Sequence, residues 1–269
     1  MPRKPGSSKS KRNFDKKVKD IVLKELKNEI EEKKAIISYD DNSLNANIPS
    51  GDVTSSLNYM RLLGPTTQIS FAQAAGDQGM YNMRVGDEIT LKHVDIKGFV
   101  SFSDLTINQQ INARVGVRVM ILRQRDENSD LGFVTNSHAN MLLEQGSTAT
   151  PSPSAFTGRP LNCIQSINKE LYAVRYDKTF YLNQSVQLSG TTNVNRSTAG
   201  VDHTLRFFQH KLTFGKRGLK LKYSDGNSDT PNNFPYVMVI GYTNLVDASA
   251  ATNGNIDVTM NSVATYTDA

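Results

Sequence analysis

The residues best suited to chemistry in this chain are the lysines and arginines at its start. The stretch "MPRKPGSSKSKRNFDKKVK" contains eight basic residues and one acidic residue, so it carries a formal charge of +7. The whole chain carries +5, which leaves −2 for the residues after Lys19. Cations at this density bind nucleic-acid phosphates without reading sequence, because they release condensed counterions. A solvated tail and a nuclear-import signal are the alternatives. The predicted phosphate contacts are Arg3, Lys4, Lys9, Lys11, Arg12, Lys16, Lys17 and Lys19.

Residue types that perform catalysis are present but are not spaced for it. The stretch "GKRG" (215–218) lacks the spaced first glycine and the Ser or Thr of a phosphate-binding loop, and no G-x-S-x-G elbow occurs. The single cysteine, Cys163, has no histidine at a zinc-ligand spacing, although a Cys–His catalytic pair stays an alternative. We therefore predict no catalytic residue, no cofactor, and a binding or structural protein. The four histidines are His93, His138, His203 and His210.

The stretch "DGNSD" places oxygen ligands at Asp225, Asn227 and Asp229, as the start of a calcium loop does. Such a loop then requires glycine at its sixth position and glutamate at its twelfth. This chain has Thr230 and Tyr236 there, which excludes an EF-hand. We expect a polar turn before a strand, and the alternative is a calcium site shared between subunits.

The elements that position these residues begin with two N-terminal segments. Residues 1–12 have Met1 as their only apolar residue besides prolines and cannot bury enough surface to offset the entropy of ordering, so we expect a disordered basic arm. Residues 13–37 carry apolar side chains at steps of three and four, which predicts an amphipathic helix. This helix packs on the rest of the protein, on copies of itself or on nucleic acid. Residues 38–65 are expected to form a linker.

From residue 66 to 269 the apolar pattern changes to period two. In residues 113–125 a set containing Val115 and Val117 alternates with a set containing Met120 and Leu122, so this strand is expected to be covered partly on both faces. Polar loops separate the runs, and one further helix is predicted near 136–145. This pattern indicates an all-β antiparallel sandwich or barrel of about eight strands. The predicted strands are 66–73, 88–103, 113–125, 171–182, 203–214, 219–223, 236–243 and 256–267.

Composition narrows the class of protein further. One cysteine rules out an internal disulfide framework and suits a reducing compartment. No apolar run approaches the ~20 residues of a membrane span, and the N-terminus lacks the apolar core of a secretory signal. We expect a soluble protein made inside a cell, with no membrane partner.

Three stretches give the chain a resemblance to a known family. "RVGDEITLKHVDIKG" (84–98) looks like an arginine–glycine turn that leads into a long alternating strand, "VRYDKTFYL" (174–182) looks like an aspartate-centred strand motif, and "NNFPYVMVIGYTN" (232–244) looks like a last hairpin. In this order, with the basic arm before them, they resemble the single jelly-roll capsid proteins of circular Rep-encoding single-stranded DNA (CRESS-DNA) viruses. The resemblance covers roughly residues 60–269.

This resemblance implies an eight-stranded jelly roll that assembles into an icosahedral shell of ~60 copies or a multiple. It implies a location in the virion, with assembly in the host nucleus or cytoplasm, and single-stranded nucleic acid as the partner, with circular DNA favoured. The mildly acidic remainder would keep the outer surface from binding nucleic acid. Basic residues on the 113–125 strand are further candidate contacts on the inner face, with salt bridges as the alternative. They are Arg114, Arg118, Arg123 and Arg125.

Two other classes of protein fit the same pattern. Coat proteins of small positive-strand RNA viruses share the architecture. A cellular β-sandwich that binds nucleic acid or carbohydrate is the second, although the sequence offers no cluster of exposed aromatic and acidic residues for a sugar. Phe207, Phe208 and Phe214 are assigned to the core or to an interface, with base stacking as the alternative.

Overall fold

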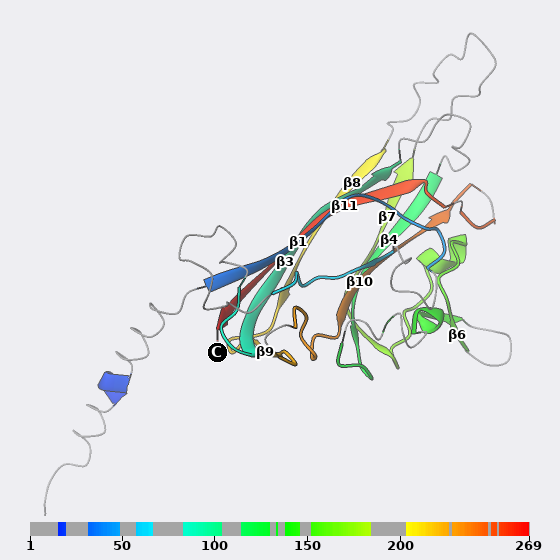
Figure 1. The fold of residues 1–269 in the computed structure, drawn as a ribbon. Coiled ribbons are helices and arrows are strands. Elements are labelled where there is room, and N and C mark those ends of the chain that lie inside the picture. The colour runs from blue at the N-terminus through cyan, green and yellow to red at the C-terminus, as the bar shows by residue number, and fades with distance from the viewer. Residues whose placement is uncertain are drawn as a thin grey trace, which may run out of the picture.

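The fold is a sandwich of two antiparallel sheets (Figure 1), seen in a computed structural model of the chain. No helix among the described residues is long and apolar enough to cross a membrane. The structure describes residues 16–19, 32–48, 58–66, 83–103, 114–129, 133, 138–145, 152–183, 203–225, 228–246, 249–251 and 253–268.

The first sheet, here called sheet A, contains the two ends of the described sandwich. Its strands lie in the order β1 (Glu32–Ser43), β11 (Ile256–Asp268), β3 (Glu88–Phe102) and β8 (Leu205–Thr213). β9 (Leu219–Lys222) continues beyond β8 and pairs with the first residues of β3. All of these pairs are antiparallel, so β1 and β8 are the edge strands of the main path.

The second sheet, sheet B, has the order β2 (Tyr59–Met60), β10 (Tyr236–Asn244), β4 (Arg114–Gln124) and β7 (Tyr172–Asn183). Along the chain, the first of the eight sandwich strands pairs with the last, the second with the seventh, the third with the sixth and the fourth with the fifth. Successive pairs alternate between the two sheets. A long antiparallel hairpin wound in this way is a jelly roll.

The described residues form eleven strands, against about eight expected. Four of them are not among the predicted strands: β1 and β2 of the sandwich, and the separate pair β5 (Leu143–Gln145) and β6 (Ser152–Ser154). β5 and β6 belong to the connection between β4 and β7. Apart from this, the strands predicted from residue 88 onward are confirmed within one or two residues at each end.

The main core lies between the two sheets and follows the period-two pattern. Val115, Val117, Val119 and Ile121 of β4 are fully buried in it, as the alternation predicted. Side chains of β3, β8 and β11 meet them from sheet A. Because successive residues of a strand point to opposite faces, one face of each strand fills this core and the other is left for different uses.

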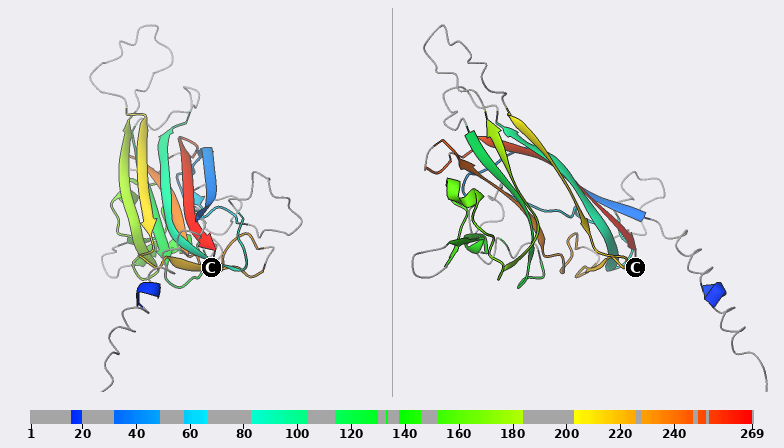
Figure 2. Two further views of the ribbon diagram at one scale, coloured as in Figure 1. Left: turned by 90° about the vertical axis from the view of Figure 1, so that its left-hand side faces the viewer. Right: turned by 180° about the vertical axis from the view of Figure 1, so that it is seen from behind.

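A second core covers the outer face of sheet B. Met120 and Leu122 of β4 pack there against Phe156 and other residues of the β4–β7 connection. A Cβ at Gly241 of β10 would lie 2.6 Å from Cε1 of Phe156, so glycine lets this ring approach the sheet. β4 is therefore covered on both faces, as expected, and the connection lies on the side of sheet B away from sheet A (Figures 1 and 2).

The predicted N-terminal helix ends too late, and the predicted linker is part of the sandwich. Residues 16–19 are helical, but Glu32–Ser43 form β1. In β1, Ala35 is buried and the strand pairs along its length with β11, which outweighs the local helical spacing. Residues 38–65 contribute the end of β1, β2 and the buried Leu44, so the sandwich begins at residue 32 and not at 66.

Two other local predictions need correction or remain untested. The helix predicted at 136–145 is a single 3-10 turn, His138–Met141, followed by β5, because Leu142 and Leu143 turn into the second core. Thr66 is described and is not in a strand, while the remainder of the predicted strand 66–73 lies outside the described residues. The arm at 1–12 lies outside them as well.

Candidate nucleic-acid interface

The basic arm leads into an edge of sheet A. Lys16, Lys17 and Lys19 lie on a helical turn and are exposed. The chain enters the sandwich at Glu32, and Lys33 Nζ binds Asp268 Oδ2 at 2.5 Å, which anchors this entry to the last strand. The remaining predicted contacts of the arm lie outside the described residues: Arg3, Lys4, Lys9, Lys11 and Arg12.

Arg118 of β4 does not form part of a nucleic-acid surface. Its side chain is 5% exposed, and its Nε and Nη2 bind the two carboxylate oxygens of Asp177 at 2.8 and 2.7 Å. Its Nη1 donates to the carbonyl oxygens of Asn162 and Gln165. Four of the five N–H donors of the guanidinium are thus used inside the protein. The predicted phosphate contact at Arg118 is wrong because the side chain is buried, and the salt-bridge alternative holds.

The other three arginines of this strand region are exposed but do not form one patch. Arg114 lies at the start of β4, and Arg123 and Arg125 lie at its other end. Arg114 and Arg123 are nine positions apart, which is about 30 Å along a strand. Their contacts with nucleic acid stay a prediction, and they cannot act as a single site within one copy.

A second concentration of positive charge lies on β8, β9 and the turn between them. We call residues 203–223 the β8–β9 ribbon. The ribbon contains six lysines and arginines and no aspartate or glutamate. The net charge of −2 for the residues after Lys19 does not reveal this cluster of cations, whereas a local charge count along the sequence would have found it. Its cations are Arg206, Lys211, Lys216, Arg217, Lys220 and Lys222.

Most of the charge of the ribbon is available to a ligand. Lys211 is 3.6 Å from Asp95 and Lys222 is 3.4 Å from Glu88, and exposed pairs of this kind hold their partners weakly. Lys216, Arg217 and Lys220 are exposed and have no ion pair among the described residues. Gly215 and Gly218 adopt positive φ angles of 72° on either side of Lys216 and Arg217. These glycines form the tight turn that presents both cations.

A small hollow beside the ribbon is lined by further basic groups. It has a volume of about 150 Å³ and is bordered by Arg175 of β7, by His210 and Lys211 of β8, and by Tyr236. The Arg175 guanidinium lies 5.9 Å from the centre of the Tyr236 ring. Burial lowers the pKa of His210 below its ordinary value of 6.5, which favours the neutral ring in the absence of a ligand. An anionic group such as a phosphate fits the charge of this hollow.

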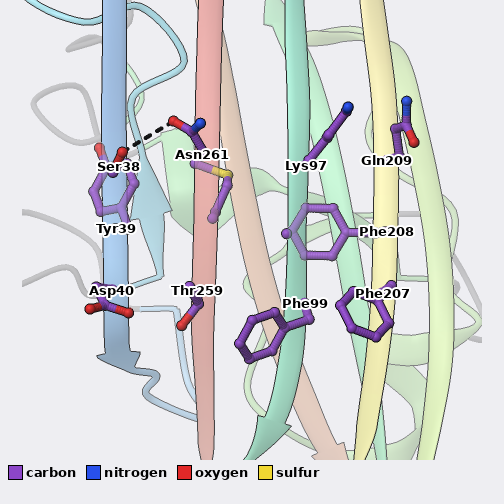
Figure 3. Close-up of a pocket in the computed structure, with 12 residues that line it drawn as sticks. Ser38, Tyr39, Asp40, Lys97, Phe99, Phe207, Phe208, Gln209, Thr259 and Asn261 are labelled. Carbon is purple, nitrogen blue, oxygen red and sulfur yellow. Dashed lines mark hydrogen bonds between the residues drawn. The ribbon is translucent and has the colours of Figure 1, made fainter.

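A groove on the exposed face of sheet A adjoins the ribbon. It has a volume of about 690 Å³ and is lined by residues of β1, β3, β8 and β11 (Figure 3). Phe207 is 73% exposed there, whereas its neighbour Phe208 is buried in the main core and Phe214 packs against that core. The core assignment is thus confirmed for Phe208 and not for Phe207. Asp40 and the rings of Phe99 and Phe207 share this groove, a grouping that is invisible in the sequence because it spans three strands.

The candidate calcium residues occur at a turn. Oδ1 of Asp225 accepts the backbone N–H of Ser228 at 2.8 Å, and the carbonyl oxygen of Asp225 accepts from Arg84. Asp229 is exposed, and Asn227 lies outside the described residues. Within the described ranges no three His, Cys, Asp or Glu side chains gather as metal ligands. The calcium site stays a prediction, and the hydrogen bonds fit the polar turn.

Cys163 is a buried side chain rather than an exposed nucleophile. Its Sγ lies 3.0 Å from Thr243 Oγ1 and 3.5 Å from the carbonyl oxygen of Gly116. Burial is the main cause that raises the pKa of this thiol, so it stays protonated at neutral pH.

Comparisons with known proteins give distant similarities only. No family model and no curated protein matches the chain. Three solved structures are similar to it: PNGF-II (9% identity, TM-score 0.35, 87% of this chain and 34% of that chain), a full particle of Israeli acute paralysis virus (12%, 0.26, 88% and 63%) and Merkel cell polyomavirus VP1 in complex with GD1a oligosaccharide (9%, 0.18, 88% and 94%). The chain spans about a third of the length of PNGF-II. All three TM-scores lie below 0.5, so the fold is assigned from the strand order.

Proposed function

We propose that this chain is a viral coat protein that assembles into a closed shell and packages single-stranded nucleic acid, with circular single-stranded DNA as the favoured genome. The observation that carries the proposal is a jelly-roll sandwich whose edge strand β1 is separated by twelve residues from a preceding segment with eight basic residues and a charge of +7. Jelly rolls of two sheets serve as viral capsid domains, although other proteins share them.

The high positive charge of the arm is explained if many copies of the chain surround one polyanion. Identical subunits form finite assemblies through closed point symmetry, and ~60 copies make the simplest icosahedral shell. Arms of +7 in such a shell concentrate on the order of 400 positive charges in one cavity, and their repulsion opposes assembly unless an anion compensates it. Nucleic acid supplies that compensation and releases its counterions. The β8–β9 ribbon adds six cations per copy in the described sandwich.

The sandwich also exposes apolar side chains that an assembly could bury. The short helix η4 (Pro160–Cys163) packs against β4 and β10. It carries Leu161, and Ile164, which follows it directly, is 76% exposed. Tyr181 lies opposite Gly116 on β4, and Val246 follows β10; both are more than half exposed. Gly116 is also in contact with Cys163 of η4, so η4 and Tyr181 both lie next to the start of β4. Exposed apolar groups that adjoin one another mark contacts between proteins.

The proposal is tested by expressing the full chain and examining its assembly and its contents. We expect uniform spherical particles in negative-stain images, and nucleic acid that is protected from nuclease. Ile164→Glu should prevent assembly without loss of the β-sheet circular dichroism signal, because the side chain is largely exposed. A wild-type protein that stays monomeric at all concentrations would contradict the proposal and favour a cellular nucleic-acid- or carbohydrate-binding sandwich.

A further inference from the structure

Two phenylalanines form an exposed aromatic platform in the groove of sheet A. The ring centres of Phe99 on β3 and Phe207 on β8 are 5.6 Å apart, and their planes meet at 64° (Figure 3). A single exposed apolar side chain is ordinary, but adjoining apolar side chains on a surface mark a binding site, and here Phe207, 73% accessible, adjoins the Phe99 ring. A flat apolar ligand could stack on Phe207 without moving either ring.

Polar groups beside the platform are of the kind that bind the edges of a nucleic-acid base. The amide side chains of Gln209 and Asn261 and the ammonium of Lys97 line the same groove (Figure 3). Ser38 Oγ donates to Asn261 Oδ1 at 3.1 Å, which orients this amide. Amides offer both a donor and an acceptor, as the edge of a base does, and Lys97 supplies a charge for a phosphate.

The distribution of charge indicates on which side of the groove the backbone of a bound nucleic-acid strand would lie. Asp40 borders the groove at β1 and would repel a phosphate. On the other side, Lys211 follows Phe207 by four residues on the same face of β8, about 13 Å along the strand. The backbone of a ligand is therefore favoured over β3 and β8, where the cationic ribbon begins, and its bases would point toward the platform.

We propose that this groove stacks unpaired bases of nucleic acid on Phe207 and Phe99 while Lys97 and the β8–β9 ribbon hold the phosphates. This inference rests on the proposed packaging function and specifies its ligand as a single strand. In a duplex the faces of the bases are already stacked on each other and are not accessible to a side chain, whereas every unpaired base can stack on an aromatic ring.

The absence of tryptophan from the chain permits a direct test. Phe207→Trp in the full chain places a single indole on the platform, and oligothymidylate added to unassembled subunits should quench its fluorescence. A duplex of the same length should not. The matched control is Tyr181→Trp, at an exposed aromatic position of sheet B that is 59% exposed, where neither ligand should quench. Equal quenching at both positions, or none at position 207 under conditions where the oligonucleotide binds, overturns the proposal.

A second measurement separates stacking from charge. Phe207→Ala should weaken single-strand binding about five- to a hundredfold, the effect of losing one stacked base, while Phe207→Tyr should bind as the wild type does. The slope of log K against log salt should stay unchanged, because no cation is lost. If Phe207→Ala binds single strands as tightly as the wild type does, the stacking inference is wrong, while the packaging function stands because the arm still binds. The stacking inference is equally wrong if the variant binds normally but fails to assemble, because the groove is then a contact between copies. Failure of the wild type to bind any nucleic acid overturns the packaging function itself.

Discussion

Arg118 of β4 and Asp177 of β7 form a two-point ion pair on neighbouring strands of sheet B, with N–O distances of 2.8 and 2.7 Å. The same guanidinium holds two carbonyl groups at the end of η4, so a single buried side chain joins the β4–β7 connection to the sheet. The exposed apolar groups Leu161 and Ile164 belong to this connection. The pair therefore positions a candidate contact between subunits and has no role in binding phosphate.

Asp177→Asn should destabilise the fold strongly. The substitution leaves the Arg118 charge buried without its counter-charge, and breaking a buried pair in this way costs about 3–5 kcal/mol, reduced here because the Asp177 side chain is 30% exposed. Urea unfolding followed by circular dichroism measures the loss. The control is Glu88→Gln, whose exposed pair with Lys222 should contribute less than about 1 kcal/mol. Equal effects of the two substitutions would contradict this assignment.

Deleting residues 1–12 should reduce packaging without affecting the sandwich. The deletion removes five of the eight cations of the arm, and every described strand begins at residue 32 or later. On single strands the salt slope changes by about 0.7 per phosphate contact, so up to roughly three or four units are expected. Replacing the five cations with glutamine should reproduce the result, because charge and not sequence acts here. Normal packaging by the glutamine variant would remove the arm from the interface.

Neutralising the turn of the β8–β9 ribbon should also lower the salt slope. The triple variant Lys216→Gln, Arg217→Gln and Lys220→Gln removes three exposed cations, and a change of up to roughly two units follows if each contacts a phosphate. The comparison variant replaces three exposed cations at one end of sheet B, Arg123→Gln, Arg125→Gln and Lys169→Gln, of which the two arginines are themselves candidate contacts. Its slope should change less than that of the ribbon variant if the ribbon is the main contact. The opposite ranking of the two triple variants would assign the contact to the β4 arginines.

His210 should make stability fall in mild acid. Burial lowers its pKa in the folded state below the ordinary 6.5, so as the pH falls the unfolded chain takes up the proton first. Stability is therefore fully present above pH 6.5 and declines as the pH drops toward the folded value. His210→Gln should remove this part of the pH dependence, measured as the unfolding free energy at several pH values. Bound nucleic acid should raise the pKa of His210 again, which NMR titration would detect, because phosphates favour the imidazolium.

The strands from residue 88 onward could be predicted because their local pattern agrees with their environment. In β4, both alternating sets of side chains meet a core, and the sequence carries apolar residues in both. β1 could not be predicted in this way. Its residues carry a helix-compatible spacing of charges and apolar groups, and only pairing with β11, more than two hundred residues later, makes them a strand.

The candidate interface, like the strands, could be predicted from the sequence only in part. The sequence by itself determined that the chain begins with a dense run of cations, and it contained the uninterrupted positive charge of residues 203–223, since net charge is a property of composition. The tertiary structure decided which side chains could use that charge. Phe208 points into the main core and Arg118 is buried on the outer face of sheet B under the β4–β7 connection, while Phe207 and Lys97 are exposed. A strand alternates its side chains, and pairing with its neighbours fixes the face that each one occupies. The groove exists only where β1, β11, β3 and β8 lie in this register, since its walls come from positions that are as much as 223 residues apart.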